Sequence, residues 1–329
     1  MKRVEFSQLQ ETLYHEKLDN GLDVYILPKS GFNKTYATFT TKYGSIDNRF
    51  IPRGKKDPID VPDGIAHFLE HKLFESEHGD VFHDFSKQGA SANAYTSFTR
   101  TAYLFSSTSN VEQNVETLLD FVQDPYFTDE SVEKEKGIIG QEIKMYDDNP
   151  DWRAYFGVIN NMYVHHPVKI DIAGTIPSIE KITKELLYTC YETFYHPSNM
   201  VFFLVGPVDP EAMFELVKNN QSKKKFSPPA TIKRFFDKEP QRVAKEKDVI
   251  YMPVQMPKCF IGFKEKNPSR QGKELLEREL AISILLDLMF GQSSKNYETL
   301  LNEGLIDHTF SFDYTAENGF GFSMIGGDT

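Results

Sequence analysis

The stretch that decides the interpretation of this chain is residues 62–74, which read Pro62-Asp63-Gly64-Ile65-Ala66-His67-Phe68-Leu69-Glu70-His71-Lys72-Leu73-Phe74. It predicts the start of a helix, because Gly64 interrupts what precedes it and Asp63 is a suitable N-cap residue. On a helix His67 and His71 are one turn apart on the same face, and Glu70 lies three residues after His67 on that side. Two imidazoles and one carboxylate should therefore converge.

Zinc suits this set of side chains. Two histidine nitrogens at about 2.0–2.1 Å can hold the metal from one helical turn. Glu70 can stay off the metal and take a proton from its bound water. The order H-x-x-E-H is the inverted form of the H-E-x-x-H motif of metallopeptidases. The same residues also fit an ordinary surface helix with two histidines, and a zinc site needs a third ligand from elsewhere in the chain.

The place to look for that third ligand is the helix predicted over residues 130–146, which Thr128 or Asp129 can cap. One face of this helix, at i, i+3, i+4 and i+7 spacing, carries two acids and two apolar residues: Glu135, Ile138, Ile139 and Glu142. Carboxylates among inward-pointing apolar residues are costly unless they are paired or bound to a metal. The alternative is that both acids lie at the edge of the stripe and pair with Lys136 or Lys144.

Composition narrows the function further. The 329 residues are 40% hydrophobic, enough for a sizeable core and, at this length, for two domains. A net charge of −11 with acids and bases interspersed argues against a nucleic-acid partner. The sequence has no apolar run that suits a membrane span, no signal-peptide pattern, and only two cysteines, Cys190 and Cys259. We therefore expect a cytoplasmic protein with no membrane partner.

Strands are predicted on both sides of the histidine helix. Asn20-Gly21 is a turn signal between residues 13–18 and 22–27, which predicts a hairpin, and residues 35–43 should form a third strand. Residues 89–106 predict a strand pair that begins with small side chains. Such an edge could accept an extended peptide as an extra strand, although an ordinary sheet fits the pattern equally well.

Helices are predicted over residues 111–122, 151–163 and 179–195, and from an Asp209 cap through residue 217. A buried strand is predicted at residues 200–206. The most linker-like stretch in the chain is residues 221–230, and we expect the domain boundary there.

A set of motifs in a fixed order carries a family resemblance. They are His67-Phe68-Leu69-Glu70-His71, then Asn93-Ala94-Tyr95-Thr96, then Glu135 and Glu142, then Gly174-Thr175, and finally Tyr195-His196-Pro197-Ser198-Asn199-Met200. In order and spacing, residues 13–206 resemble the pitrilysin/insulinase family of zinc peptidases. Within that family the likeness is greatest to bacterial processing-peptidase-like proteins.

The resemblance implies the roles of individual residues. His67, His71 and Glu142 match the ligands of one Zn²⁺ per chain, and Glu70 matches the general base. Glu135 matches an acid that orients a ligand histidine. The edge strand that binds substrate backbone matches Asn93, Ala94, Tyr95 and Thr96.

The resemblance also implies the architecture, an α+β fold of two similar α/β-roll halves, each an antiparallel-rich sheet flanked by helices. We expect a zinc-bearing catalytic domain at residues 1–220, a linker at 221–247, and a homologous non-catalytic domain at 248–329. In the second half, residues 249–253 and 258–263 resemble strands and 275–290 a helix. The chain stops at Thr329 inside a strand-like run, so we expect this half to be incomplete.

One departure from the family pattern concerns partners. Active single-chain relatives carry an arginine and a tyrosine in the second half, which bind substrate backbone and help to stabilise the tetrahedral intermediate. Leu301 stands where the arginine belongs, and Ile306-Asp307 stand where the tyrosine belongs. We therefore expect a zinc endopeptidase that obtains the missing pair from a paralogous subunit in a heterodimer, or from a second copy in a homodimer.

Other interpretations remain open at this stage. The chain could be a non-catalytic scaffold subunit of the same family. It could also be a lyase with the same H-x-x-E-H pattern, but such a site takes a cysteine as its third ligand and neither Cys190 nor Cys259 lies in a suitable turn. A site of two histidines and one glutamate favours zinc, yet it can also load manganese or cobalt.

Overall fold

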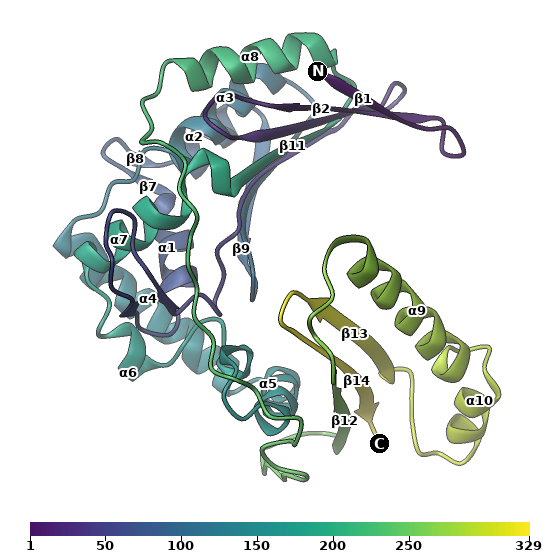
Figure 1. Ribbon diagram of the computed structural model, residues 1–329. Helices are drawn as coiled ribbons and strands as arrows, with labels where there is room; N and C mark the ends of the chain where they lie inside the picture. Colours follow the sequence, from purple (N-terminus) through teal and green to yellow (C-terminus); the bar gives the residue numbers. More distant parts are fainter. The chain divides into compact units, whose positions relative to one another are not determined.

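A computed structural model describes residues 1–329, and by internal contacts the chain forms two compact units (Figure 1). The first unit comprises Met1–Gln141 and Ile172–Phe235. The second comprises Glu142–Asp171 and Phe236–Thr329, so that a segment from the middle of the chain belongs with its C-terminal part. No helix combines the length and the apolar character needed to cross a membrane.

A sheet forms the centre of the first unit (Figure 1). It has seven strands in the order β1-β2-β3-β11-β4-β10-β9. Its strands are β1 (Lys2–Phe6), β2 (Glu11–Lys17), β3 (Asp23–Pro28), β4 (Thr35–Thr41), β9 (Ala90–Thr96), β10 (Thr101–Ser107) and β11 (Met200–Gly206). All neighbours are antiparallel except β3 and β11. The hairpin predicted around Asn20-Gly21 is confirmed as β2–β3, and the predicted strand pair as β9–β10.

Helices cover this sheet and supply much of the core. Those that pack on its strands are α1 (Ile65–Leu73), α2 (Phe82–Lys87), α3 (Val111–Val122) and α8 (Pro210–Ser222). The other helices are α4 (Asp129–Asp147), α6 (Ile176–Ile179) and α7 (Lys184–Phe194). The helix predicted over 179–195 corresponds to α7, which begins at Lys184, and only Ile179 of the predicted range belongs to α6. Short strand pairs β5 (Arg49–Phe50) with β6 (Ile59–Asp60) and β7 (Glu75–Ser76) with β8 (Gly79–Asp80) lie in the connections, and η2 is Pro197–Asn199.

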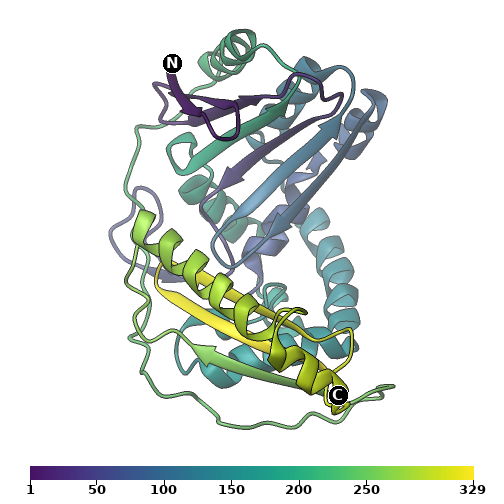
Figure 2. The same cartoon turned by 90° about the vertical axis from the view of Figure 1, so that its right-hand side faces the viewer.

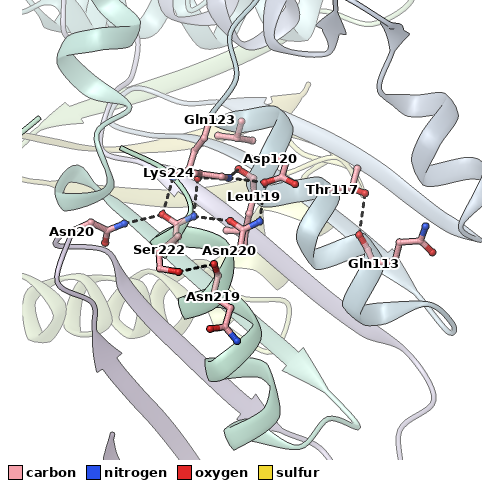
Figure 3. Close-up of polar contacts among 12 residues, drawn as sticks. Asn20, Gln113, Thr117, Leu119, Asp120, Gln123, Asn219, Asn220, Ser222 and Lys224 are labelled. Atoms are coloured by element: carbon pink, nitrogen blue, oxygen red, sulfur yellow. Dashed lines mark hydrogen bonds and ion pairs between the residues drawn. The ribbon is translucent and has the colours of Figure 1, made fainter. Parts of the chain in front are cut away.

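Polar contacts join the ends of α3 and α8 (Figure 3). The side-chain amide of Asn220 donates to Asp120 Oδ1 at 2.8 Å, and Lys224 Nζ donates to the carbonyl oxygen of Leu119 at 3.0 Å. Lys224 also pairs with Asp120 at 2.7 Å. Because buried polar groups are stable only when their hydrogen bonds are made, these contacts fix where α8 ends and where the following segment leaves the first unit.

The second unit contains a three-stranded antiparallel sheet in the order β12-β14-β13. Its elements are α5 (Pro150–Met162), η1 (Pro167–Lys169), β12 (Lys258–Lys264), α9 (Gly272–Phe290), α10 (Lys295–Asn302), β13 (Ser311–Glu317) and β14 (Phe320–Asp328). The order repeats β4-β10-β9 of the first unit, with helices in the same place along the chain. The predicted α+β class with two similar halves is thus confirmed.

Helix α5 packs against β12, and α9 lies on the opposite face of the small sheet (Figure 2). The approach of α5 is close because Gly262 has no side chain. A Cβ there would lie 2.5 Å from Val158 and 2.7 Å from the sulfur of Met162. The strand predicted at 249–253 is absent, because these residues have no neighbouring strand to pair with, and Tyr251 is 93% exposed.

A single carboxylate ties the start of the C-terminal segment to the end of α5. Glu239 accepts the backbone N–H groups of Val164, His165 and His166 at 2.7–2.9 Å and pairs with Lys264 at 2.8 Å. Burial alone would raise the pKa of Glu239, but the hydrogen bonds from Lys264 and the three amides hold it at about 2. This clamp explains why residues 142–171 group with the C-terminal elements.

Candidate metal centre

Helix α1 begins with a close backbone contact instead of a side-chain cap. The prediction that Asp63 is the N-cap is wrong, because Gly64 occupies that position with φ +87 and no side chain caps the helix. A Cβ on Gly64 would lie 2.4 Å from the carbonyl oxygen of Ala173, and one on Gly174 would lie 2.5 Å from that of Asp63. The hydroxyl of Ser178 donates to the same Asp63 carbonyl at 2.8 Å. These contacts give a physical reason for the Gly174-Thr175 motif, since they fix the start of α1.

The apolar side chains of α1 point into the core and orient the motif. Ile65, Ala66, Phe68, Leu69 and Leu73 are all buried. The rings of His67 and His71 are 4.5 Å apart between centroids, as expected for residues one helical turn apart. Glu70, between them in sequence, is only 7% exposed.

Helix α4 brings the two predicted acids toward this helix. The Oε1 atom of Glu135 lies 3.0 Å from Nδ1 of His71, and the two side chains are 13% and 28% exposed. A carboxylate on Nδ1 leaves Nε2 of the same ring available as a ligand atom. Lys136 pairs with Glu133 at 2.6 Å and not with Glu135, so the alternative ion pairing is not the one formed.

Glu142 follows two turns later on the same uninterrupted helix. The ligand atoms of His67, His71 and Glu142 all lie within 4.8 Å of one another. Of the two isoleucines on the predicted stripe, Ile139 is buried, whereas Ile138 is 48% exposed. The apolar stripe is therefore narrower than predicted, because only Ile139 of the two isoleucines packs into the core.

Glu70 has a hydrogen-bond donor that the sequence did not reveal. The hydroxyl of Thr96, at the end of β9, donates to Glu70 Oε2 at 2.6 Å. A hydrogen bond to the ionised form of a carboxylate favours that form. Burial raises the pKa of the Tyr103 and Tyr195 phenols, whose oxygens are 2.9 Å apart, and the negative charge of Glu70 adds to the shift. Those tyrosines stay neutral behind the site.

The predicted peptide-binding residues lie on an edge strand. β9 pairs only with β10, so one side of its backbone faces no other strand of the sheet. Side chains alternate along it, with Asn93 and Tyr95 exposed and Ala94 and Thr96 partly buried. Because side chains alternate along a strand, Asn93 and Tyr95 point to one face of β9 and Thr96 points to the other, where it contacts Glu70.

A second contact missed from the sequence is at Glu142. The hydroxyl of Tyr146, one turn further along α4, donates to Glu142 Oε1 at 2.6 Å.

Two imidazoles and one carboxylate, with a second carboxylate behind one imidazole, form the donor set of a catalytic zinc site, in which a further position is left to water or substrate. The side chains present therefore fit a zinc ion.

Two family descriptions match the chain. "Insulinase (Peptidase family M16)" matches residues 57–176, which contain α1 and α4, and "Peptidase M16 inactive domain" matches residues 181–329. The chain is 69% identical over 329 residues to the uncharacterized zinc protease YmfH of Bacillus subtilis (strain 168), covering all of this chain and 77% of YmfH. The predicted likeness to processing-peptidase-like bacterial proteins of this family is confirmed.

Solved structures agree with these matches. The crystal structure of a putative M16-like peptidase from Alicyclobacillus acidocaldarius has 47% sequence identity and a TM-score of 0.95, covering 99% of this chain and 76% of that one. A protease from Helicobacter pylori shares the fold at 22% identity with a TM-score of 0.79, covering 96% of this chain and 75% of that one. The chain therefore belongs to the insulinase family, peptidase family M16.

Proposed function

We propose that this chain is the zinc-bearing part of a metalloendopeptidase, with one Zn²⁺ held by His67, His71 and Glu142. The observation that carries the proposal is the convergence of their three ligand atoms within 4.8 Å. The Glu135 contact to His71 supports it, since a carboxylate behind a ligand histidine fixes the ring and its tautomer. Relatives named zinc proteases supply the choice of metal.

The chain's own residues divide the work of peptide hydrolysis. A zinc ion bound here would polarise the peptide carbonyl and lower the pKa of a water molecule. Glu70 takes the proton of that water on its carboxylate and delivers it to the leaving amine. The Thr96 hydrogen bond supports this role because it stabilises the ionised carboxylate, the form that can accept a proton.

The proposed substrate is a peptide in extended conformation. The free edge of β9 can hydrogen-bond a peptide backbone as an added strand, and residues 93–96 would contact it. β9 ends at Thr96, which contacts Glu70, so a peptide lying along this edge passes the proposed base. Backbone recognition of this kind selects conformation more than sequence.

We further propose that a paralogous subunit, or a second copy of this chain, completes the active site. The support is the departure from the family pattern: Leu301, in α10, is an exposed apolar residue, and Ile306-Asp307 follow in a loop. None of them can donate a hydrogen bond to an oxyanion as arginine or tyrosine does. Loss of one oxyanion donor typically costs about 2.7–4 kcal/mol of transition-state stabilisation, so we expect the chain alone to be slow.

The same departure favours a second candidate, a scaffold subunit without peptidase activity. The two candidates differ at the metal. A scaffold has no need to keep Glu135 against His71 and Thr96 against Glu70, and both contacts are made here. We therefore rank the peptidase first.

Metal analysis combined with a fluorogenic peptide assay tests the proposal. Wild type, Glu142→Gln and the control Glu133→Gln are purified, and zinc per chain is measured in each. The proposal predicts close to one zinc in wild type and in Glu133→Gln and much less in Glu142→Gln. Zinc without cleavage supports the proposal that a second subunit completes the active site. Fast cleavage by the chain alone refutes that proposal. Absence of zinc in the wild type refutes the peptidase and leaves the scaffold.

A further inference from the structure

The third proposed ligand is held by a tyrosine on its own helix. Tyr146 follows Glu142 by four residues on α4, so the two side chains lie on one face of the helix. The Tyr146 hydroxyl donates to Glu142 Oε1 at 2.6 Å. The bond occupies one of the two carboxylate oxygens and fixes the direction in which the other points.

Tyr146 is itself held in place by the start of the next helix. Its ring stacks on that of Trp152, with centroids 4.3 Å apart and planes 12° from parallel. The indole Nε1 of Trp152 donates to Asp171 Oδ2. All of these residues belong to the segment 142–171, so the arrangement lies within one compact unit.

The turn between α4 and α5 makes the stacking possible. Asn149 caps α5 by accepting the backbone N–H groups of Asp151 and Trp152, and Pro150 provides a preset φ at the first position. Asp147 and Arg153 pair across the turn at 2.9 Å. Tyr146 and Trp152 are thereby brought face to face by local sequence alone.

We propose that Tyr146 is a positioning residue for the metal ligand Glu142, and that Trp152 and Asp171 hold Tyr146 in the position this requires. The inference rests on the metal site proposed above. A glutamate has several rotamers, and a ligand fixed before the metal arrives loses less conformational entropy on binding. Removing a hydrogen-bond partner of a metal ligand typically weakens metal binding about 10–100-fold.

A purely structural role for Tyr146 would give a different result. If the ring served only to pack on Trp152, then Tyr146→Phe, which keeps the ring and removes only the hydroxyl, would leave zinc affinity unchanged. Tyr155→Phe is the matched control, because it removes a phenolic hydroxyl from α5, where the ring packs near Phe322. The two variants differ mainly in whether a metal ligand loses its donor.

Zinc affinity is measured by competition with a chromophoric chelator for wild type, Tyr146→Phe, Tyr155→Phe and Glu142→Gln. We expect Tyr146→Phe to bind zinc about 10–100-fold more weakly than wild type and Tyr155→Phe to match wild type. If wild type and Tyr146→Phe agree within about twofold while Glu142→Gln loses the metal, this inference is wrong and the metal site stands. A wild type that binds no zinc overturns both.

Trp152 offers a second readout, because it is the single tryptophan of the chain and its emission reports on this cluster alone. Asp171→Asn keeps the shape of the acceptor and removes its charge. We expect an altered emission spectrum before zinc is added and a smaller loss of zinc affinity than in Tyr146→Phe. Altered emission with unchanged affinity would show that Asp171 and Trp152 do not act on Glu142.

Discussion

The contact between Glu135 and His71 predicts how strongly a substitution of Glu135 weakens zinc binding. Its Oε1 atom lies 3.0 Å from His71 Nδ1, and its side chain is 13% exposed, so water competes weakly for the contact. A hydrogen bond to a charged group is worth about 1.5–3 kcal/mol. With 1.4 kcal/mol per factor of ten, that range is roughly 10–150-fold in affinity. Glu135→Gln keeps an acceptor and should weaken zinc binding about 10-fold, and Glu135→Ala should approach 100-fold.

The assay is competition with a zinc chelator, and the control is Glu133→Gln. Glu133 lies on the same helix, pairs with Lys136 at 2.6 Å and has a 68% exposed side chain. Lys136 is buried, but it also donates to the carbonyl oxygen of Glu180 at 3.1 Å, so it keeps an acceptor when the charge of Glu133 is removed. The reasoning is refuted if Glu135→Ala binds zinc as tightly as wild type, or if Glu133→Gln weakens binding as much as Glu135→Gln does.

Three further predictions concern the base, the helix start and pH. Thr96→Val removes the 2.6 Å hydrogen bond to Glu70 and should lower kcat about 10-fold at unchanged zinc content, with Thr96→Ser restoring it; an unchanged kcat would contradict this role. Gly64→Ala places a Cβ 2.4 Å from the Ala173 carbonyl at a positive φ and should destabilise the fold by about 1–3 kcal/mol in urea unfolding; a neutral result would mean that the helix start can shift. Burial lowers the pKa of His166 to about 4, against the opposing charge of a neighbouring carboxylate, so the unfolded state binds a proton first as pH falls below about 6.5. The free energy of unfolding should therefore fall by roughly 2–3 kcal/mol between pH 7 and 4 in wild type and by less in His166→Asn. An equal loss of unfolding free energy over this pH range in both proteins, measured by urea unfolding at each pH, would refute the assignment.

Local sequence predicts the elements that local contacts form. The apolar period of residues 111–122 gives α3 with the observed bounds, and the Asp209 cap gives the start of α8, where its carboxylate accepts the Ala212 N–H at 2.8 Å. The Asn20-Gly21 turn gives the β2–β3 hairpin, because the two strands are neighbours in sequence and in the sheet. Each of these features is decided within about twenty residues of chain.

Long-range pairing is not decided in this way. β4 was predicted as a strand, but it is separated from β3 by β11, which comes from residues 200–206 and pairs with both. Helix α5 packs on β12, about a hundred residues later, through the space left by Gly262. A glycine in a strand pattern indicates close approach of something, but it does not say which element approaches.

The residues of the candidate site also differ in whether local sequence or long-range packing brings them together. The spacing of His67, Glu70 and His71 places them on one helix turn, and the resemblance to a known family adds Glu135 and Glu142 from α4. The hydrogen bonds from Thr96 to Glu70 and from Tyr146 to Glu142 could not be found in this way. The contact of Thr96 with Glu70 depends on how β9 lies beside α1, which local sequence does not determine. Tyr146 follows Glu142 by one helical turn, and this spacing alone does not distinguish a hydrogen-bonded pair from two unrelated surface residues.

An anomalous difference map, recorded at the zinc absorption edge from crystals of the protein grown with zinc, tests the central claim most directly. The account predicts one strong peak about 2.0–2.2 Å from a nitrogen of His67, Nε2 of His71 and a carboxylate oxygen of Glu142. Glu70 should stay off the metal with its hydrogen bond to Thr96 intact. A zinc-containing crystal with no peak at these three side chains, or with Glu142 turned away from the peak, would contradict it.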